Sequence, residues 1–295
     1  MPSRRCTLTA VGAIAAGRYS SATPTDRFVR REFVDTLNGQ IHIRRAGQPV
    51  PGGPTPTFCF HQSPQSSLVY ADLLPYLAVD RMAIACDTPG FGESFRPQTQ
   101  QPTVSDYAAW LAEVPRSLGI TSFDAVGMFT GTAIAVEMQR LFPMHIRRMA
   151  LIGPALFDEG ERRDMLARAW PERPSEDGGF FLREWKRVFD RYPTNMPINQ
   201  KFAAYGECYR GGANAIFGEV AVNSYDMRVM LPRVSLPVLI IDPEGTAGRG
   251  GEAHAGLAGS TYVKADGKSG LGLLQSEPVW VADQLLRFFD TSRPG

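Results

Sequence analysis

The segment 127–131, Gly-Met-Phe-Thr-Gly, constrains the fold of this chain more than any other feature of the sequence. An apolar run ending at Val126 precedes it, and a run with helical spacing, residues 133–141, follows it. Two glycines that bracket three residues between a strand and a helix are typical of a nucleophile elbow, a sharp turn that exposes its central residue. The central residue here is Phe129, whose phenyl ring cannot attack a carbonyl. The chain therefore keeps the frame of such a turn and lacks the nucleophile expected in it.

Apolar runs and helical patterns alternate along the chain. The dipeptide Asn38-Gly39 predicts a two-residue hairpin turn between the first two strands. Short apolar runs predict strands at residues 33–37, 41–45, 57–60, 82–86, 123–126, 149–152, 237–241 and 261–263. Helical spacing predicts helices at residues 107–118, 133–141 and 279–289. This alternation indicates an α/β fold with a mostly parallel central sheet covered by helices on both faces.

The composition changes between the predicted strands 149–152 and 237–241, where aromatic residues lie among charges and turn residues. We interpret this stretch as an inserted helical cap, in which most aromatics pack the cap onto the sheet and a few face a cavity. The expected organisation is an N-terminal extension at residues 1–28, a core formed by residues 29–154 and 237–295, and a cap at residues 155–236.

Charge and cysteine usage exclude several classes of protein. With 31 Lys and Arg against 30 Asp and Glu, the formal net charge is +1, and no basic block is interleaved with aromatics, so we expect no nucleic-acid partner. The four cysteines are scattered without metal-ligand spacing, which predicts neither a zinc site nor a disulfide framework. No apolar run approaches the roughly 20 residues of a membrane-spanning helix.

The first residues carry a candidate targeting signal. Residues 3–5, Ser-Arg-Arg, precede a mildly apolar stretch that extends to Gly17, and no acidic residue occurs before Asp26. This pattern is similar to a twin-arginine export signal or an organelle transit peptide, but the apolar stretch is short and Arg18 interrupts it. We expect a cytoplasmic protein, with export or organelle targeting as the alternative.

Four motifs occur in the order found in the α/β-hydrolase superfamily, which the chain resembles over nearly all of residues 33–290. His-Gln-Ser-Pro at 61–64 resembles a loop that supplies an oxyanion-hole amide, and 87–94 resembles the Asp-x-x-Gly-x-Gly-x-Ser turn. The elbow at 127–131 and the Glu-Pro pair at 277–278 complete the series. Within the superfamily the chain is most similar to a branch with His-Gln-x-Pro and Gly-x-His-Thr-Gly signatures.

The resemblance also implies where a catalytic triad would lie, and all three positions are substituted. The nucleophile position is Phe129, the general-base position is Leu271, and the acid falls at or beside Thr246. A triad needs a nucleophile, a base and an orienting acid, and none of these three residues can take its expected role. Asp242 and Glu244 precede the expected acid and are the candidates for a displaced one.

Among the four histidines, His61 is the best remaining candidate for proton transfer, because it follows a predicted strand at the edge where α/β folds bind ligands. The resemblance implies that this residue chiefly holds the oxyanion loop, and both roles stay open. His254 lies in a glycine-rich segment that could fold over the pocket. His42 and His145 are interpreted as surface or packing residues.

Backbone amides near Gln62 and Ser63 and at Thr130 are expected to form an oxyanion hole, because they do not depend on a nucleophilic side chain. The hydroxyls of Ser63 and Thr130 are candidate catalytic groups or simple capping groups. The ligand should be a hydrophobic small molecule carrying one or two oxygens, since an apolar pocket floor is expected from Met128, Phe129 and Leu271.

Three functions follow from this pattern. The first is a cofactor-free, non-hydrolytic enzyme of cyclase, isomerase or lyase type, with specialised metabolism as its setting. The second is a hydrolase of an ester, lactone or epoxide that uses displaced residues such as His61 or His254, with Tyr205, Tyr209 or Tyr225 as a proton donor. The third is a small-molecule binding protein without chemistry. We expect no cofactor and no metal, because no phosphate-binding glycine loop, flavin signature or metal constellation is present. The oligomeric state has no signal in the sequence.

Overall fold

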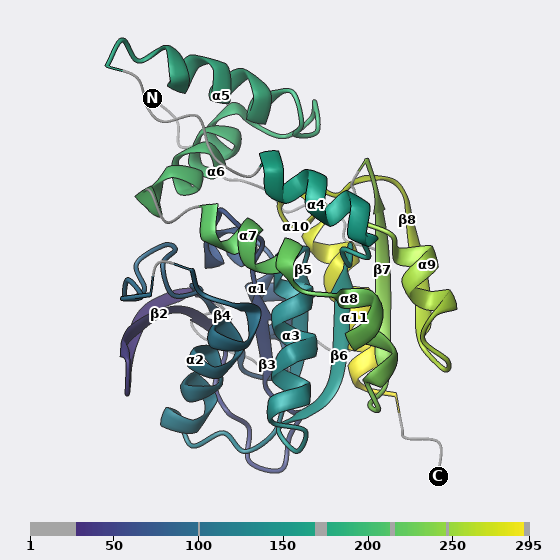
Figure 1. Ribbon diagram of the computed structural model, residues 1–295. Helices are drawn as coiled ribbons and strands as arrows, with labels where there is room; N and C mark the ends of the chain where they lie inside the picture. The colour runs from purple at the N-terminus through teal and green to yellow at the C-terminus, as the bar shows by residue number, and fades with distance from the viewer. Residues whose placement is uncertain (1–27, 100, 169–175, 213–215, 246–247, 292–295) are drawn as a thin grey trace, which may run out of the picture.

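The computed structural model describes residues 28–99, 101–168, 176–212, 216–245 and 248–291, so the candidate targeting segment lies outside the described residues. An eight-stranded sheet in the order β1-β2-β4-β3-β5-β6-β7-β8 runs through the middle of the molecule (Figure 1). Its strands are β1 Arg30–Thr36, β2 Gly39–Ala46, β3 Thr57–Phe60, β4 Ala83–Cys86, β5 Phe123–Met128, β6 Ile146–Ile152, β7 Val238–Glu244 and β8 Thr261–Ser269.

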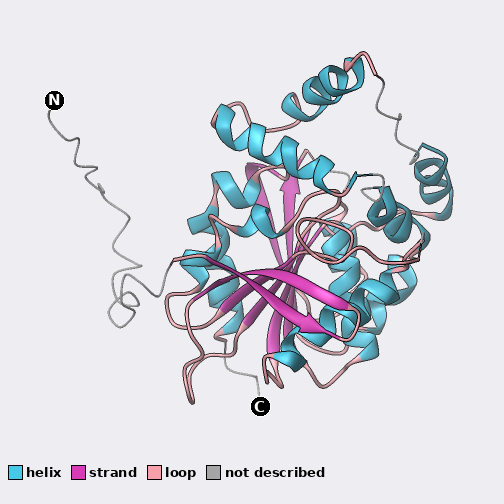
Figure 2. Cartoon of the chain, turned by 90° about the vertical axis from the view of Figure 1, so that its left-hand side faces the viewer, coloured by secondary structure: helices cyan, strands magenta, loops and turns pink. Residues whose placement is uncertain are grey.

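The predicted α/β fold with a mostly parallel sheet is confirmed. Strands β1 and β2 form the antiparallel hairpin expected at Asn38-Gly39, and β2 pairs antiparallel with β4. The remaining neighbours, from β4 through β8, pair in parallel. Figure 2 shows the resulting twist of the sheet between its helices.

Several strands are longer than predicted, and β6 and β8 are two of them. Strand β6 begins at Ile146 rather than at residue 149, and β8 continues to Ser269 rather than ending at residue 263. The extension of β8 is mostly polar and exposed because this strand forms an edge of the sheet, and among the described strands only β7 pairs with it. An exposed edge needs no apolar residues, so its sequence carries no hydrophobic signal.

The helices lie on both faces of the sheet and at one of its ends (Figures 1 and 2). Helix α2 begins with a capping box, in which Thr103 and Asp106 satisfy each other's backbone N–H groups. The helices are α1 Leu74–Leu77, α2 Val104–Ser117, α3 Thr130–Leu141, α4 Glu159–Arg168, α5 Gly179–Phe189, α6 Ile198–Arg210, α7 Phe217–Ser224, α8 Met227–Met230, α9 Gly250–Ala255, α10 Leu273–Ser276 and α11 Pro278–Phe289, with 3-10 turns η2 Ser67–Tyr70 and η4 Leu231–Arg233.

The core consists of two apolar layers, one on each face of the sheet. Alternate strand residues such as Phe58 and Ile84 pack against α2 and α3, whereas Cys59 and Ala85 pack against α1 and α11. Strands β3 and β4 are buried along their whole length. Because successive side chains of a strand point to opposite faces, a continuous apolar run is what a doubly covered strand requires.

Helices α4 to α8 and turn η4 lie between β6 and β7 in the described chain, where the helical cap was predicted. In Figure 1, α5 and α6 stand farthest from the sheet, and α7 lies between them and the core. We call residues 155–236 the cap segment, and its division from the core at residues 154 and 237 stays a prediction.

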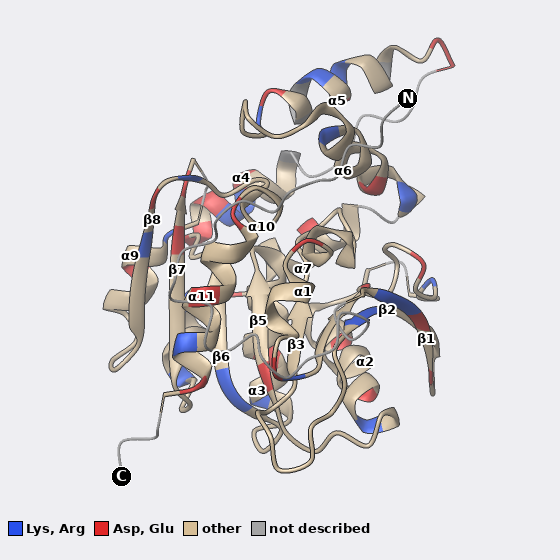
Figure 3. Ribbon diagram, turned by 180° about the vertical axis from the view of Figure 1, so that it is seen from behind, with Lys and Arg blue, Asp and Glu red and all other residues tan. Residues whose placement is uncertain are grey.

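The described surface shows no dominance of one charge. Figure 3 shows basic and acidic residues interspersed over the elements seen from behind, in keeping with a net charge of +1. Within the described ranges no helix has both the length and the apolar character to cross a membrane.

One buried carboxylate makes the stability of the fold depend on pH. Asp124, near the start of β5, is fully buried, and its Oδ2 accepts a hydrogen bond of 2.5 Å from Arg147 Nη2. Its other oxygen, Oδ1, has no partner among the described residues. Burial raises the pKa of Asp124 to about 6, because desolvation outweighs the attraction of Arg147.

We therefore predict that the free energy of unfolding of Asp124→Asn rises relative to that of the wild type as the pH rises. A carboxyl whose folded pKa is raised binds its proton more tightly in the folded state, so its contribution to stability falls between about pH 4 and pH 6. Urea unfolding of both proteins should show the variant gaining about 2 kcal/mol relative to the wild type over that range. A difference that stays constant with pH would contradict the assignment.

Candidate functional site

The elbow between β5 and α3 keeps its strained geometry although its central residue is Phe129. Phe129 has φ 47° and ψ −109° and is the one non-glycine residue of the described chain with a positive φ. Such a conformation costs about 1–3 kcal/mol and persists only where the surroundings impose it. The glycines impose it here, since a Cβ on Gly127 would lie 2.4 Å from the carbonyl oxygen of Gly131. A Cβ on Gly131 would lie 2.0 Å from the carbonyl oxygen of Phe60 in β3.

The ring of Phe129 fills space at the ends of the central strands. It is partly buried and packs against the core layer that lies under α1 and α11. A Cβ on Gly153, the residue after β6, would lie 2.5 Å from Cε1 of Phe129, so the ring rests directly on the Gly153 backbone. The expected nucleophile position thus holds a packed hydrocarbon.

Thr130 and Ser63 form the polar part of the site. The Thr130 N–H, at the first position of α3, donates no hydrogen bond within the described part of the chain. The N–H of Ser63 donates to Thr130 Oγ1 at 2.7 Å, and that hydroxyl lies 3.4 Å from Ser63 Oγ. Of the expected oxyanion donors, the Gln62 and Thr130 amides donate no hydrogen bond among the described residues, and the Ser63 amide is occupied by the Thr130 hydroxyl.

Gln62 connects this loop to the cap segment. Its Nε2 donates to Gln65 Oε1 at 2.6 Å, and Gln65 Nε2 donates to Tyr192 Oη at 2.5 Å. Gln62 Oε1 is buried without a partner among the described residues. A second connection is the hydrogen bond that the Ser66 hydroxyl donates to Glu207 of α6. Tyr192, in the loop between α5 and α6, and Glu207 of α6 therefore help to position the oxyanion loop.

His61 has no nitrogen available for proton transfer in this arrangement. Its Nε2 accepts the N–H of Thr88 at 2.9 Å, so Nδ1 carries the proton and donates to the carbonyl oxygen of Gln62 at 2.9 Å. Burial lowers the pKa of His61, which keeps the imidazole neutral. The geometry thus favours the loop-holding role over the catalytic one.

The other histidines lie elsewhere. His254 Nδ1 is 2.7 Å from Ser260 Oγ, and the ring stacks on Tyr262 of the edge strand β8. His145 Nδ1 lies 3.0 Å from the carbonyl oxygen of Thr121. His42 is not at the surface, because its Nδ1 lies 2.9 Å from Asp87 Oδ2 in the interior.

Asp87 organises the buried polar groups under the site, although the sequence singled it out only as part of a turn. Its oxygens accept hydrogen bonds from the N–H groups of Ser67 and Glu93, and Arg44 lies 3.7 Å away. Burial by itself raises the pKa of Asp87, but these donors and His42 hold it well below its usual value. The carboxylate is therefore a fixed anion that aligns loops.

Neither candidate for a displaced acid is paired with a histidine. The oxygens of Asp242 accept the N–H groups of Gly250 and Gly251 at the start of α9 and the hydroxyl of Tyr262. Glu244, the last residue of β7, is exposed. Thr246, the expected acid position, lies outside the described residues.

Leu271, at the expected base position, faces the cap segment. It packs against a small cluster formed by Tyr192, Met196 and Ala204. The following residue, Gly272, has φ 80°, and a Cβ there would lie 3.2 Å from the Tyr192 ring. Contact with the inserted helices thus replaces the imidazole expected in this loop.

A small cavity remains above the elbow, with a volume of about 10 Å³, which is room for a single water molecule. Helix α7 closes it, because Gly218 lies so near Ser63 that a Cβ would be 1.9 Å from Ser63 Oγ. Met128, expected at the pocket floor, is buried in the core layer under α11 and does not line this cavity. The lining residues are Ser63, Thr88, Val104, Tyr107, Thr130, Ile134, Gly218, Ala221 and Val222.

Several lining residues were not found from the sequence. Val104 and Tyr107 lie on α2, and Ile134 lies on α3, where each belongs to an ordinary apolar stripe. A stripe predicts burial but does not distinguish contact with the core from contact with a cavity. The glycine spacing at residues 127–131 located only the backbone of the elbow and not the side chains that line the cavity.

Phe129→Ser should not create an esterase. The introduced hydroxyl would have no proton acceptor, because Leu271 stands at the expected base position and both nitrogens of His61 are engaged. We expect no burst of p-nitrophenol from p-nitrophenyl acetate and no acyl adduct by intact-protein mass spectrometry, as for Phe129→Ala. A stoichiometric burst specific to the serine variant would contradict the assignment of Leu271.

Comparisons with known proteins agree with the fold and the motifs. A family model described as alpha/beta hydrolase fold matches residues 55–208. Over 127 residues, the chain is 31% identical to 2-hydroxy-6-oxo-2,4-heptadienoate hydrolase of Pseudomonas putida, covering 42% of this chain and 46% of that protein. Proline iminopeptidase of Heyndrickxia coagulans is 25% identical over 138 residues, covering 45% and 47%. The matches thus span about half the length of these curated relatives.

A solved structure extends the likeness to nearly the whole chain. The enol-lactonase of Burkholderia xenovorans matches with a TM-score of 0.72 at 16% identity, over 88% of this chain and 100% of that one. At this identity the match shows the fold alone. Because the family model covers more than half of the residues, the chain belongs to the alpha/beta hydrolase fold family.

Proposed function

We propose that this protein is a hydrolase that cleaves a small, activated oxo compound, with water as the nucleophile and without a covalent acyl-enzyme. The observation that carries the proposal is the free N–H of Thr130 at a retained, strained elbow. A fixed backbone donor stabilises the negative charge that develops on a carbonyl oxygen, whatever nucleophile attacks the carbon. The family relationship and the hydrolases among the relatives support the reaction class.

The substrate has to be activated because the described site offers no base. His61 is engaged at both nitrogens, and Leu271 is a hydrocarbon. A leaving group must then depart without a proton from an imidazole, which favours an enol or another conjugated group over a simple alkoxide. The relative from Pseudomonas putida is named for such a substrate, a 6-oxo dienoate. Simple alkyl esters are expected to be poor substrates.

In the proposed reaction water adds to the carbonyl carbon while the carbonyl oxygen becomes negative against the Thr130 N–H. Before this, the enol of the substrate shifts its proton to the carbon next to the carbonyl, which makes that carbon saturated and leaves it beside an unsaturated ketone. The bond between it and the hydrated carbonyl carbon then breaks. Its electron pair passes into the conjugated system, which takes up a proton derived from the water, and the carbonyl carbon leaves as a carboxylic acid. Atoms and electrons balance without an oxidant, a reductant or a cofactor.

Substrate entry requires two local changes, since the closed cavity holds about 10 Å³. Helix α7 has to move away from Ser63, because Gly218 lies against that side chain. The Thr130 hydroxyl has to rotate from the Ser63 N–H, which it now occupies. The second change frees another amide, so a bound oxyanion would receive two backbone donors.

A non-hydrolytic cyclase, isomerase or lyase is the second candidate, and the packed ring of Phe129 is the observation that favours it. The same amides stabilise an enolate, and a hydrocarbon floor excludes the water that hydrolysis needs. Orientation of a reactive substrate alone can contribute about 7–11 kcal/mol to lowering a barrier in favourable cases. The two candidates differ in whether water enters the product.

Reaction in water enriched in oxygen-18 distinguishes the candidates. With a 2-hydroxy-6-oxo-2,4-dienoate as substrate, we expect two fragments, one a carboxylic acid that carries one solvent oxygen, and no covalent protein adduct. Mass spectrometry of products and of the intact protein measures both. An isomer of unchanged mass would support the cyclase or isomerase class, and an acyl adduct would refute attack by free water. Binding without any product, seen as a raised unfolding temperature, would favour a non-catalytic protein.

Substitutions at Thr130 test the oxyanion donor. Thr130→Pro removes the N–H at the first helical position, where proline is otherwise accepted, so we expect a loss of about 100-fold or more in kcat. Thr130→Val keeps the N–H and removes the hydroxyl, and its effect should stay within about tenfold. Unfolding temperatures of both variants control for folding. The reverse ranking of the two variants, with both folded, would contradict the oxyanion proposal.

A further inference from the structure

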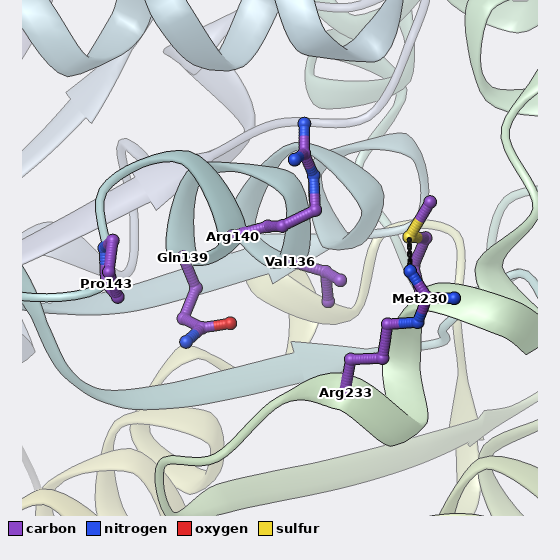
Figure 4. Close-up of a pocket in the computed structure, with 6 residues that line it drawn as sticks. All are labelled: Val136, Gln139, Arg140, Pro143, Met230 and Arg233. Atoms are coloured by element: carbon purple, nitrogen blue, oxygen red, sulfur yellow. Dashed lines mark hydrogen bonds between the residues drawn. The ribbon is translucent and has the colours of Figure 1, made fainter.

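A second pocket lies away from the elbow, between the C-terminal half of α3 and the end of the cap segment. Its volume is about 180 Å³, the space of about six water molecules. It is lined by Val136, Gln139, Arg140, Pro143, Met230 and Arg233. The first four residues come from α3 and the turn after it, and the last two from α8 and η4 (Figure 4).

Gln139 gives this pocket an unusual polar wall. The residue is only 7% exposed, and its side-chain amide makes no hydrogen bond to another residue of the described chain. Figure 4 shows this amide on one side of the pocket and Arg233 on the other, with Val136 between them. Its polar atoms are not among the buried atoms that lack a partner, so the amide is open to water or a ligand in the pocket.

Arg233 is exposed and supplies a positive charge to the pocket. Its guanidinium lies against Met230, with Nη1 4.0 Å from the sulfur, and it forms no ion pair with a described carboxylate. The second arginine differs, because the guanidinium of Arg140 is directed away from Gln139 and Arg233 in Figure 4 and pairs with Glu137 at 2.6 Å. Arg140 therefore contributes its aliphatic stem to the wall.

Glu137 does not cancel the charge of Arg233. It accepts hydrogen bonds from Arg140, from Ser105 at 2.5 Å and from Tyr225 at 3.0 Å, so its oxygens are already engaged. Burial by itself raises the pKa of Glu137, but these donors lower it, so the group is an anion matched to Arg140. Val136, Pro143 and Met230 complete the pocket with apolar surface.

We propose that this pocket, the α3–η4 pocket, binds a small monocarboxylate with a short apolar body and a second oxygen at its far end. The carboxylate pairs with Arg233, whose planar guanidinium suits bidentate contact, and the far oxygen accepts from the Gln139 amide. The apolar body lies on Val136 and Met230. A ligand of about seven or eight non-hydrogen atoms is suited to this volume.

The location makes this a site separate from the elbow. Gln139 is nine residues beyond Thr130 along α3, or about 14 Å at the rise of an α-helix. The ligand would bridge α3, whose first residue carries the proposed oxyanion donor, to the last turn of the cap segment. Binding here does not depend on the proposed hydrolysis.

Calorimetric titration of the full chain with 4-oxopentanoate, pentanoate and pentanamide tests the proposal. We expect saturable binding of both acids, tighter for 4-oxopentanoate, and none of the neutral amide. Arg233→Met should weaken both acids by about tenfold or more. Gln139→Met, which keeps the side-chain length, should remove the preference for 4-oxopentanoate. The matched control Arg163→Met, an exposed arginine of α4, should bind as the wild type does.

Several results would overturn the proposal. Equal affinity for pentanoate and pentanamide would show that charge plays no part. Unchanged binding by a folded Arg233→Met protein would remove the proposed cation, and absence of binding by either acid would remove the site. Loss of binding in Thr130→Pro but not in Arg233→Met would assign the ligand to the elbow. Conversely, failure of the hydrolysis assay leaves this titration unaffected, so the two proposals fail separately.

Discussion

The site depends on a steric constraint, the close approach of backbone to backbone where β5 turns into α3. Gly131 sits against the Phe60 carbonyl and Gly127 against Gly131, at separations that leave no room for a methyl group. This contact brings the start of α3 beside the loop after β3, so that Thr130 meets Ser63. The strained φ of Phe129 and the position of the free amide both follow from it.

The constraint explains how a backbone donor can be held in place independently of the neighbouring side chains. A donor made of backbone depends on the path of the chain, and the two glycines fix that path. A nucleophile or a base depends on one side chain, and Phe129 and Leu271 stand at the positions where the resemblance places those. The Thr130 N–H can stabilise any reaction that places negative charge on oxygen. The two candidate enzyme classes therefore share this donor and differ in whether water is added to the substrate.

The parts of the structure that were predictable from the sequence are those with local signals. Glycine spacing located the elbow, Asn38-Gly39 located the hairpin, and apolar runs located the buried strands. The polar half of β8 carried no such signal because an edge strand faces solvent. The engagement of His61 by Thr88 and the burial of His42 beside Asp87 join residues far apart in the chain, and no local pattern reports such contacts.

A chain of two hydrogen bonds connects the oxyanion loop to the cap segment, through the side-chain amides of Gln62 and Gln65 and the hydroxyl of Tyr192. Its members are buried, so the interior supplies no water to replace a broken link. If the cap segment moves away from the core, Tyr192 moves with it. The side-chain amide of Gln65 then has no hydrogen-bond acceptor until water enters. Docking of the cap segment and ordering of the oxyanion loop are consequently one cooperative event.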